Sequence, residues 1–239
     1  MMRKFFLSLF VMSMVLAGCG SDDSSGAPPT DDTTDDNGGG PTPSATYRIT
    51  FRPDFTADNF PEDYPDNPRF SEILVAVHAT NSHIFQEGTQ ASDGIKALAE
   101  TGDPAELVNE LSAQGDDDTI LFLVTVAPND GGPTDEQAVT VTIDPEKTSI
   151  SFITSLSPSP DWFVGVDAQS LVTGNTLVEE LDINLVAFDA GTDSGMSYES
   201  PDEPTDPPGL ITEIDTPPLG NDSGLSSIIG TLRIERTDI

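Results

Sequence analysis

Short apolar runs recur along the chain and are separated by residues that form turns. Some runs alternate apolar and polar residues one by one, which is typical of a strand with one buried face, and others read as more fully buried strands. The alternating runs are TYRITFR (46–52) and AVTVTI (138–143). The more fully buried runs are EILVAVHAT (72–80), TILFLVTVA (119–127) and SISFITSL (149–156). Two further runs are INLVAF (183–188) and IIGTLRIER (228–236). We expect about eight strands.

Turn residues are frequent between these runs. The chain holds 20 glycines and 20 prolines, and short strands at regular spacing with such punctuation are typical of a β-sandwich or barrel. Residues 46–239 are long enough for one ordinary domain with a core of its own. The predicted fold class is all-β: an antiparallel β-sandwich of about eight strands, with one or two short helices in a long connection.

One region, residues 92–115, carries helix signals instead. Ser92 or Asp93 can cap a first helix and Gly102 can end it. Asp103 can cap a second helix, with Pro104 at its first position and Glu106 in the place of a capping box, and Gly115 ends it. The apolar residues that would face the sandwich are Ile95, Leu98, Leu107, Val108 and Leu111.

The N-terminal residues have the pattern of a secretion signal. Arg3 and Lys4 precede an apolar run, 5–16, that is too short for a membrane span, which needs about 20 apolar residues. The run leads into Leu-Ala-Gly-Cys, which resembles the bacterial lipoprotein signal, whose cysteine is lipidated after cleavage. We predict a signal peptide over 1–18 and a lipid anchor on Cys19, the only cysteine of the chain. The alternative is an ordinary secretion signal in which this cysteine has no role.

Residues 20–45 contain no large apolar side chain and therefore cannot bury enough surface to offset the loss of chain entropy on folding. We assign 19–45 to the lipidated cysteine and a disordered Asp/Gly/Pro-rich tether, and 46–239 to the folded domain. The anchor predicts a place in the bacterial cell envelope, and Gly20 rather than Asp after the cysteine indicates the outer membrane.

The chain is strongly acidic, with 42 Asp and Glu residues against 9 Lys and Arg and a formal net charge of −33. Nucleic acid and bare anionic membrane are therefore poor partners. Most of this charge is explained by a solvated surface adapted to salt. Attraction of cations is expected only where several carboxylates converge.

Five segments, taken in order, resemble the spondin domain, the N-terminal module of F-spondin and mindin type matrix proteins that is also found alone in bacterial surface proteins. They are FPEDYPDNPRFSEILVAVH (60–78), FQEGTQASDGIKALAETGD (85–103), SFITSLSPSPDWFVGVD (151–167), DAGTDSG (189–195) and ITEI (211–214). The resemblance implies an antiparallel β-sandwich with one structural calcium ion at one end. Its metal residues correspond here to Asp161, Asp189 and Asp193.

Calcium chemistry agrees with this assignment, because Ca²⁺ takes six to eight oxygen ligands in flexible geometry and loops at one end of a sandwich can bring distant carboxylates together. Other roles are open: Asp161 can accept hydrogen bonds from turn amides, and Asp193 can serve to brace its loop instead of binding the ion. Asp144 and Glu146 are possible additional ligands. Asp167 is expected to be solvated, and Trp162, His78 and His83 are expected to be structural.

The resemblance and the anchor together predict a non-catalytic, lipid-anchored envelope module for binding or adhesion, whose partner is an envelope or extracellular protein or a glycan. The cysteines of the animal domains are missing, so a larger share of the stability falls on core packing and the ion. Two alternatives are a secreted hydrolase with a carboxylate pair and a purely structural envelope protein. The sequence has no GxSxG, HExxH or P-loop motif, so we do not expect an enzyme.

Overall fold

The computed structural model describes residues 44–115, 120–126, 131–221 and 223–238, so the predicted signal, Cys19 and nearly all of the predicted tether lie outside the described residues. The elements are, in order, β1 (Ala45–Pro53), β2 (Arg69–Phe70), β3 (Ile73–His78), α1 (Asp93–Thr101), α2 (Ala105–Gly115), β4 (Ile120–Val126), β5 (Gln137–Ile143), β6 (Ser149–Ser157), β7 (Trp162–Ser170), β8 (Val172–Thr173), β9 (Thr176–Leu177), β10 (Glu180–Leu185), β11 (Ala187–Asp189), β12 (Thr212–Glu213) and β13 (Gly230–Arg236).

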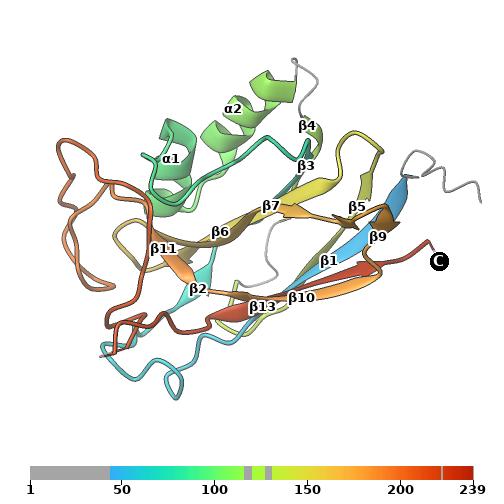
Figure 1. Cartoon of the computed structure of the whole chain (residues 1–239). Helices are drawn as coiled ribbons and strands as arrows, with labels where there is room; N and C mark the ends of the chain where they lie inside the picture. The colour runs from blue at the N-terminus through green and yellow to red at the C-terminus, as the bar shows by residue number, and fades with distance from the viewer. Residues whose placement is uncertain (1–43, 116–119, 127–130, 222, 239) are drawn as a thin grey trace, which may run out of the picture. The chain divides into compact units, whose positions relative to one another are not determined.

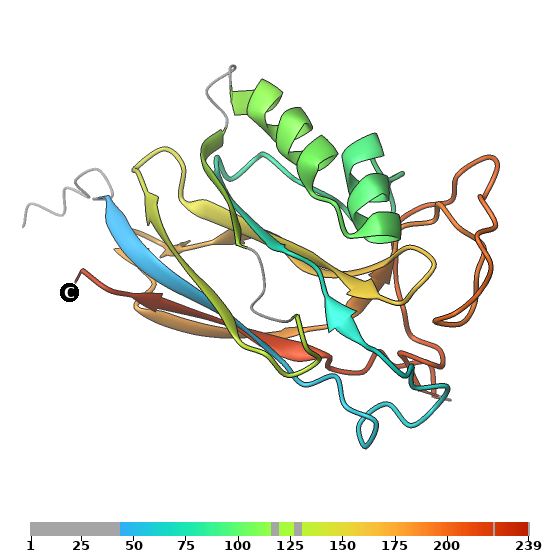
Figure 2. The same ribbon diagram turned by 180° about the vertical axis from the view of Figure 1, so that it is seen from behind.

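Two antiparallel sheets face each other. One has the strand order β10-β13-β1-β5, and the other has the order β12-β11-β7-β6-β3-β4, with β2 added beside β6. The two helices lie in the long connection between β3 and β4 and cover the outer face of the second sheet (Figures 1 and 2). The predicted all-β sandwich with two short helices in one connection is confirmed.

Strand β3 explains why some runs are apolar on both faces. Ile73, Val75 and Val77 belong to the core between the two sheets, whereas Leu74 and Ala76 belong to a second core under the helices. Successive side chains of a strand point to opposite faces, so a strand between two apolar layers needs apolar residues at every position. β6 is also buried at all positions except its last, but five of its nine residues are serine or threonine, so apolar layers alone do not explain its sequence.

Both helices begin and end where the sequence predicts. Ser92 accepts a hydrogen bond on its side chain from the Ile95 N–H, and Gly102 ends α1 in the left-handed conformation at φ 75°. Asp103 Oδ1 accepts from the Ala105 N–H at 2.9 Å and so caps α2. The helix residues that pack into the second core are Ile95, Leu98, Leu107, Leu111 and, partly buried, Val108.

The run 183–188 was expected to form one strand, and this expectation is wrong. β10 ends at Leu185 and pairs with β13 in the first sheet, whereas β11 begins at Ala187 and pairs with β7 in the second sheet. The chain thus changes sheets at Val186. Leu185 and Ala187 are both buried, so the hydropathy pattern continues across the step and hides it.

Candidate functional site

The pairing of β7 with β11 brings Asp161 and Asp189 to the same end of the sandwich. In this ladder Ala187 lies opposite Val164 and Asp189 lies opposite Trp162. One step further, the Ala190 N–H donates to the Asp161 carbonyl at 3.1 Å. Two segments that are distant in sequence are therefore joined by backbone hydrogen bonds.

A tight turn before β7 sets the position of Asp161. Ser159 Oγ donates to the Leu156 carbonyl at 2.6 Å and accepts from the Trp162 N–H at 3.2 Å. Trp162 itself is buried in the sandwich core and packs edge-on against Tyr198, with ring centroids 5.3 Å apart. Its predicted packing role is confirmed, and this packing fixes the residue next to Asp161.

The Asp161 carboxylate is fully buried and only half of it is satisfied. Its Oδ2 atom accepts hydrogen bonds from the Thr192 N–H at 2.6 Å, the Asp193 N–H at 3.0 Å and Thr192 Oγ1 at 3.2 Å. Its Oδ1 atom is buried and has no hydrogen-bond partner among the residues described. A buried charged oxygen without a partner is costly and marks a position where a cation would be stabilising.

Burial and, next, the charge of Asp189 raise the pKa of Asp161, the hydrogen bonds from Asp193 and Thr192 oppose this rise, and the resulting pKa is about 6. Burial also raises the pKa of Asp189, against hydrogen bonds from the Gly191 N–H and the Trp162 side chain. Asp161 is buried, Asp189 is partly buried and its charge acts on Asp161, so the two form a site of concentrated negative charge.

Asp193 braces the loop that carries it. Its Oδ1 atom accepts from the Gly195 N–H at 2.7 Å and its Oδ2 atom accepts from the Glu203 N–H at 2.9 Å. Its charge contributes to the raised pKa of Asp189, so it also belongs to the same electrostatic cluster. The bracing role foreseen as the alternative for this residue is therefore present in the structure.

Gly191 allows this loop to fold back on itself. Its φ of 73° lies in the left-handed region, and a Cβ atom here would come within 2.8 Å of the Gly209 backbone. The Gly209 N–H donates to the Gly191 carbonyl at 2.7 Å, so the segment around Gly209 is clamped against the aspartate loop. Only glycine fits such an approach without strain.

Asp161 and Asp189 fit a hard cation such as Ca²⁺, because they supply carboxylate oxygens and one of those oxygens is buried without a partner. Within residues 44–115, 120–126, 131–221 and 223–238, however, no group of three or more His, Cys, Asp or Glu side chains could hold a metal ion. Calcium at Asp161 would therefore also need backbone carbonyl oxygens and water.

The possible additional ligands Asp144 and Glu146 do not join this site. They lie in the turn before β6, whereas Asp161 follows the far end of that nine-residue strand. Asp144 Oδ1 instead accepts from the N–H groups of Glu146 at 2.9 Å and Lys147 at 2.8 Å and so closes its own turn.

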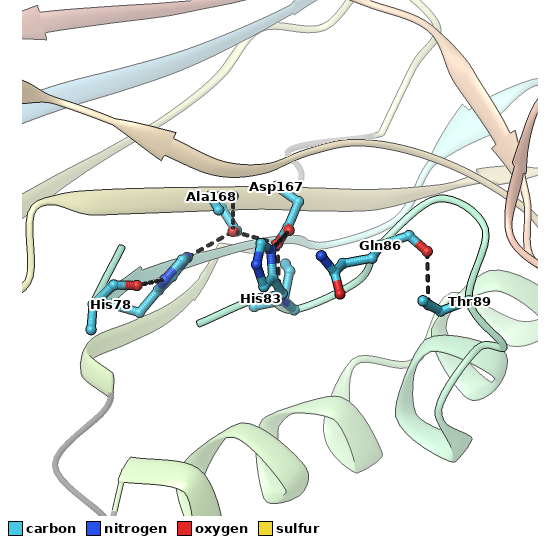
Figure 3. A network of polar contacts seen from close by, with 9 residues as sticks. His78, His83, Gln86, Thr89, Asp167 and Ala168 are labelled. Atoms are coloured by element: carbon cyan, nitrogen blue, oxygen red, sulfur yellow. Dashed lines mark hydrogen bonds and ion pairs between the residues drawn. The ribbon is translucent and has the colours of Figure 1, made fainter. Parts of the chain in front are cut away.

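A polar network on the second sheet was missed by the sequence reasoning (Figure 3). Asp167 was expected to be solvated, and this is wrong: its Oδ2 atom lies 2.5 Å from His83 Nδ1, and its Oδ1 atom accepts from the Ile84 N–H at 2.8 Å and Ser151 Oγ at 2.9 Å. His83 and Asp167 are 84 positions apart, so no local pattern could reveal the pair.

The network continues into the core at His78. Its two ring nitrogens each lie 2.8 Å from an oxygen, Nδ1 from the Ala79 carbonyl and Nε2 from Ser151 Oγ. Burial lowers the pKa of His78, so its ring is held neutral in the fold. The expected structural role of this histidine fits these contacts, whereas His83 is partly exposed at the edge of the network.

The family model Spondin_N matches residues 45–224, which include both aspartate segments and both helices. The chain belongs to the Spondin_N family. Among curated relatives, this Spondin_N chain is 33% identical to spondin-2 of Rattus norvegicus over 175 residues, 72% of this chain and 53% of the relative. It is 34% identical to spondin-1 of Rattus norvegicus over 182 residues, 73% of this chain and 23% of the relative.

The predicted spondin resemblance is thus confirmed, and the chain spans about half the length of the spondin-2 relatives that it matches. In this Spondin_N domain the strand ladder brings together Asp161 and Asp189, which the motifs had singled out. Across the part of the chain that the structure describes, no helix is long and apolar enough to cross a membrane.

Proposed function

We propose that this protein is a non-catalytic binding or adhesion module of the bacterial cell envelope, held to the membrane by a lipid on Cys19 and stabilised at one loop end by a calcium ion. The observation that carries the calcium proposal is the buried, unpartnered Oδ1 atom of Asp161 in loops that also hold Asp189. Family membership supports a binding module as the general function.

The calcium ion would be held by Asp161 and Asp189, with Asp193 nearby as a further negative charge. Asp193 already accepts one N–H on each oxygen, so its contribution is charge and any remaining lone pair. Backbone carbonyl oxygens of the loop would complete the coordination. The ion would offset the repulsion between the carboxylates and stiffen the loops that meet a partner.

The burial of the same carboxylates argues against hydrolysis. A carboxylate pair that acts as acid and base must reach the substrate bond from both sides, whereas Asp161 has an exposed fraction of 0% and three hydrogen bonds already on one oxygen. We therefore propose that the partner is bound and not cleaved, and that it is an envelope or extracellular protein or a glycan.

Thermal unfolding tests the calcium proposal. At a free calcium concentration about ten times the dissociation constant, binding adds about 1.4 kcal/mol to the free energy of unfolding, which raises the midpoint by roughly 3–6 °C for a domain of this size. We expect this rise with millimolar calcium and its loss with excess chelator. Magnesium at the same concentration is the control. A midpoint that chelator leaves unchanged contradicts the proposal.

The lipid anchor is tested separately in cells. An alkyne-labelled fatty acid supplied to a bacterium expressing the full chain should label the protein, and the protein should sediment with the outer-membrane fraction. The Cys19→Ala variant should lose the label and leave the membrane. Labelling that survives this substitution contradicts the anchor but leaves the calcium proposal intact.

A binding screen against envelope proteins and glycans, run with calcium and with chelator, tests the proposed function as a whole. We expect at least one partner whose binding falls when calcium is removed. Binding of nothing in either condition would favour the purely structural alternative. Release of sugar from a bound glycan by the purified protein would favour the hydrolase.

A further inference from the structure

A cavity of about 390 Å³ lies where the chain changes sheets, and none of Asp161, Asp189 and Asp193 lines it. Three segments line it: the loop 83–87, residues 165–167 of β7, and residues from Ile183 on β10 to Phe188 on β11. The step at Val186 creates it, because β10 continues in one sheet and β11 in the other and both leave side chains at the gap. Its volume is that of a site for a small molecule.

Packed aromatic rings form the centre of the apolar part of this pocket's wall. Phe85 and Phe188 line it, with ring centroids 5.4 Å apart, and both rings also contact Phe163 at 5.0 Å and 5.5 Å. A Cβ atom on Gly165 would come within 2.9 Å of the Phe85 ring, so this ring lies directly on β7. The remaining apolar lining, Val166, Ile183 and Val186, is only partly buried and is available to a ligand.

The imidazole of His83, a polar group in the wall, is oriented by its contact with Asp167. His83 lines the pocket, and its Nδ1 atom is held by Asp167, whose other oxygen is itself fixed by the Ile84 N–H and Ser151 Oγ (Figure 3). A carboxylate at Nδ1 selects the tautomer with the proton on that atom, so Nε2 of the neutral ring carries a lone pair. No residue in the described part of the chain hydrogen bonds to Nε2.

The charge of the surroundings limits what can bind. Glu87 also lines the pocket, and the formal net charge of the chain is −33, so an anionic ligand is disfavoured. An acceptor nitrogen in an aromatic wall selects a ligand that donates a hydrogen bond. The amides of Asn184 and Gln86 line the same pocket and add donors and acceptors beside it.

We propose that this pocket binds a phenolic ring: the ring packs against Phe85, Phe188 and the aliphatic wall, and its hydroxyl donates to Nε2 of His83. Aromatic rings prefer the edge-on and offset contacts that these walls offer. The phenol could belong to a small molecule or to a tyrosine side chain, which share the same chemistry. This site does not depend on the calcium or on the lipid anchor.

The test is a titration of the full-length ¹⁵N-labelled chain with p-cresol, 4-methylanisole and 4-methylbenzoate, followed by NMR. We expect p-cresol to bind with a dissociation constant of about 1 mM and to shift the Gly165 backbone amide and the Asn184 side-chain amide. 4-Methylanisole has the same shape but no O–H donor, so it should bind about fivefold more weakly. The anion should bind most weakly. If N-acetyltyrosinamide binds as tightly as p-cresol, the result favours a tyrosine side chain of a protein partner as the natural ligand.

Two variants separate the acceptor from the wall. His83→Phe should make p-cresol and 4-methylanisole bind equally, whereas Ile183→Ala should weaken both alike and keep their ratio. The proposal is overturned if wild-type protein binds the two ligands equally, if the shifts lie elsewhere, or if 4-methylbenzoate binds best. These wild-type comparisons decide the matter even if His83→Phe does not fold.

Discussion

Asp161→Asn provides the sharpest test of the aspartate site, because it should stabilise the protein without calcium and weaken its response to calcium. The substitution removes a fully buried negative charge while an amide oxygen can still accept from the Thr192 N–H, the Asp193 N–H and Thr192 Oγ1. The oxygen without a partner is replaced by an amide nitrogen. The folded state thus keeps these hydrogen bonds and loses the cost of the charge, in exchange for the smaller cost of a buried amide nitrogen without a partner.

The magnitude follows from the pKa. Burial and Asp189 raise the pKa of Asp161 from 3.8 to about 6, which means that ionising this carboxyl costs about 3 kcal/mol more in the fold than in the unfolded chain. The folded state binds its proton more tightly, so the penalty is absent below pH 3.8, grows as the pH rises and is complete above about pH 6. In chelator at pH 7 the loss of this penalty alone raises the midpoint of the variant by roughly 6–12 °C, and the unpaired amide nitrogen reduces this gain.

The assay is thermal unfolding of both proteins from pH 4 to pH 7.5, with chelator and with calcium. The gain of the variant should vanish near pH 4, level off above pH 6 and shrink when calcium is added, because only wild type gains from the ion. Asp161→Ala is the control: it leaves three donors without an acceptor and should destabilise at every pH. A variant that is less stable than wild type in chelator at pH 7, or a difference that does not change with pH, would refute the reasoning.

Three further predictions concern the fold around the site. Gly191→Ala should destabilise the protein more than Gly174→Ala, because both residues have a positive φ but only at Gly191 would a Cβ atom meet backbone within 4 Å. Urea midpoints of the two variants measure the difference, and equal losses of stability would contradict the close contact with Gly209. Asp167→Ala should cost about 1–3 kcal/mol because it leaves the Ile84 N–H without its acceptor, with Asp167→Asn as the milder control in the same urea series. Leu98→Ala should lower the free energy of unfolding by about 2–5 kcal/mol, whereas the control Leu210→Ala should change it very little because Leu210 is 51% exposed. A small loss for Leu98→Ala would show that α1 does not unfold together with the rest of the domain.

Local structure could be read from the sequence because its causes are local. The caps at Ser92 and Asp103 and the stop at Gly102 act within one helical turn, and the structure has all three. Residues of β3 are apolar at every position but the last because the strand lies between two apolar layers, so its burial on both faces was also visible. β6 is buried to the same degree, although five of its nine residues are serine or threonine. The family motifs also indicated that acidic residues gather at one end of the sandwich.

Other features depended on which strands pair, and hydropathy does not report pairing. The run 183–188 reads as one strand, yet its two parts join different sheets and leave the pocket between them. Asp167 was expected to be solvated because its neighbours along the chain suggest nothing else. Its real partner, His83, reaches it only through the packing of the loop 83–87 on β7.

The sequence by itself determined the strand-rich fold class, the two capped helices and the choice of Asp161, Asp189 and Asp193 as candidate metal residues. Only the tertiary structure decided that one oxygen of Asp161 is buried without a partner and that Asp193 braces its loop. The physical reason is range: capping and periodicity act over a few residues, whereas burial and hydrogen-bond satisfaction depend on contacts that only the assembled sheets create.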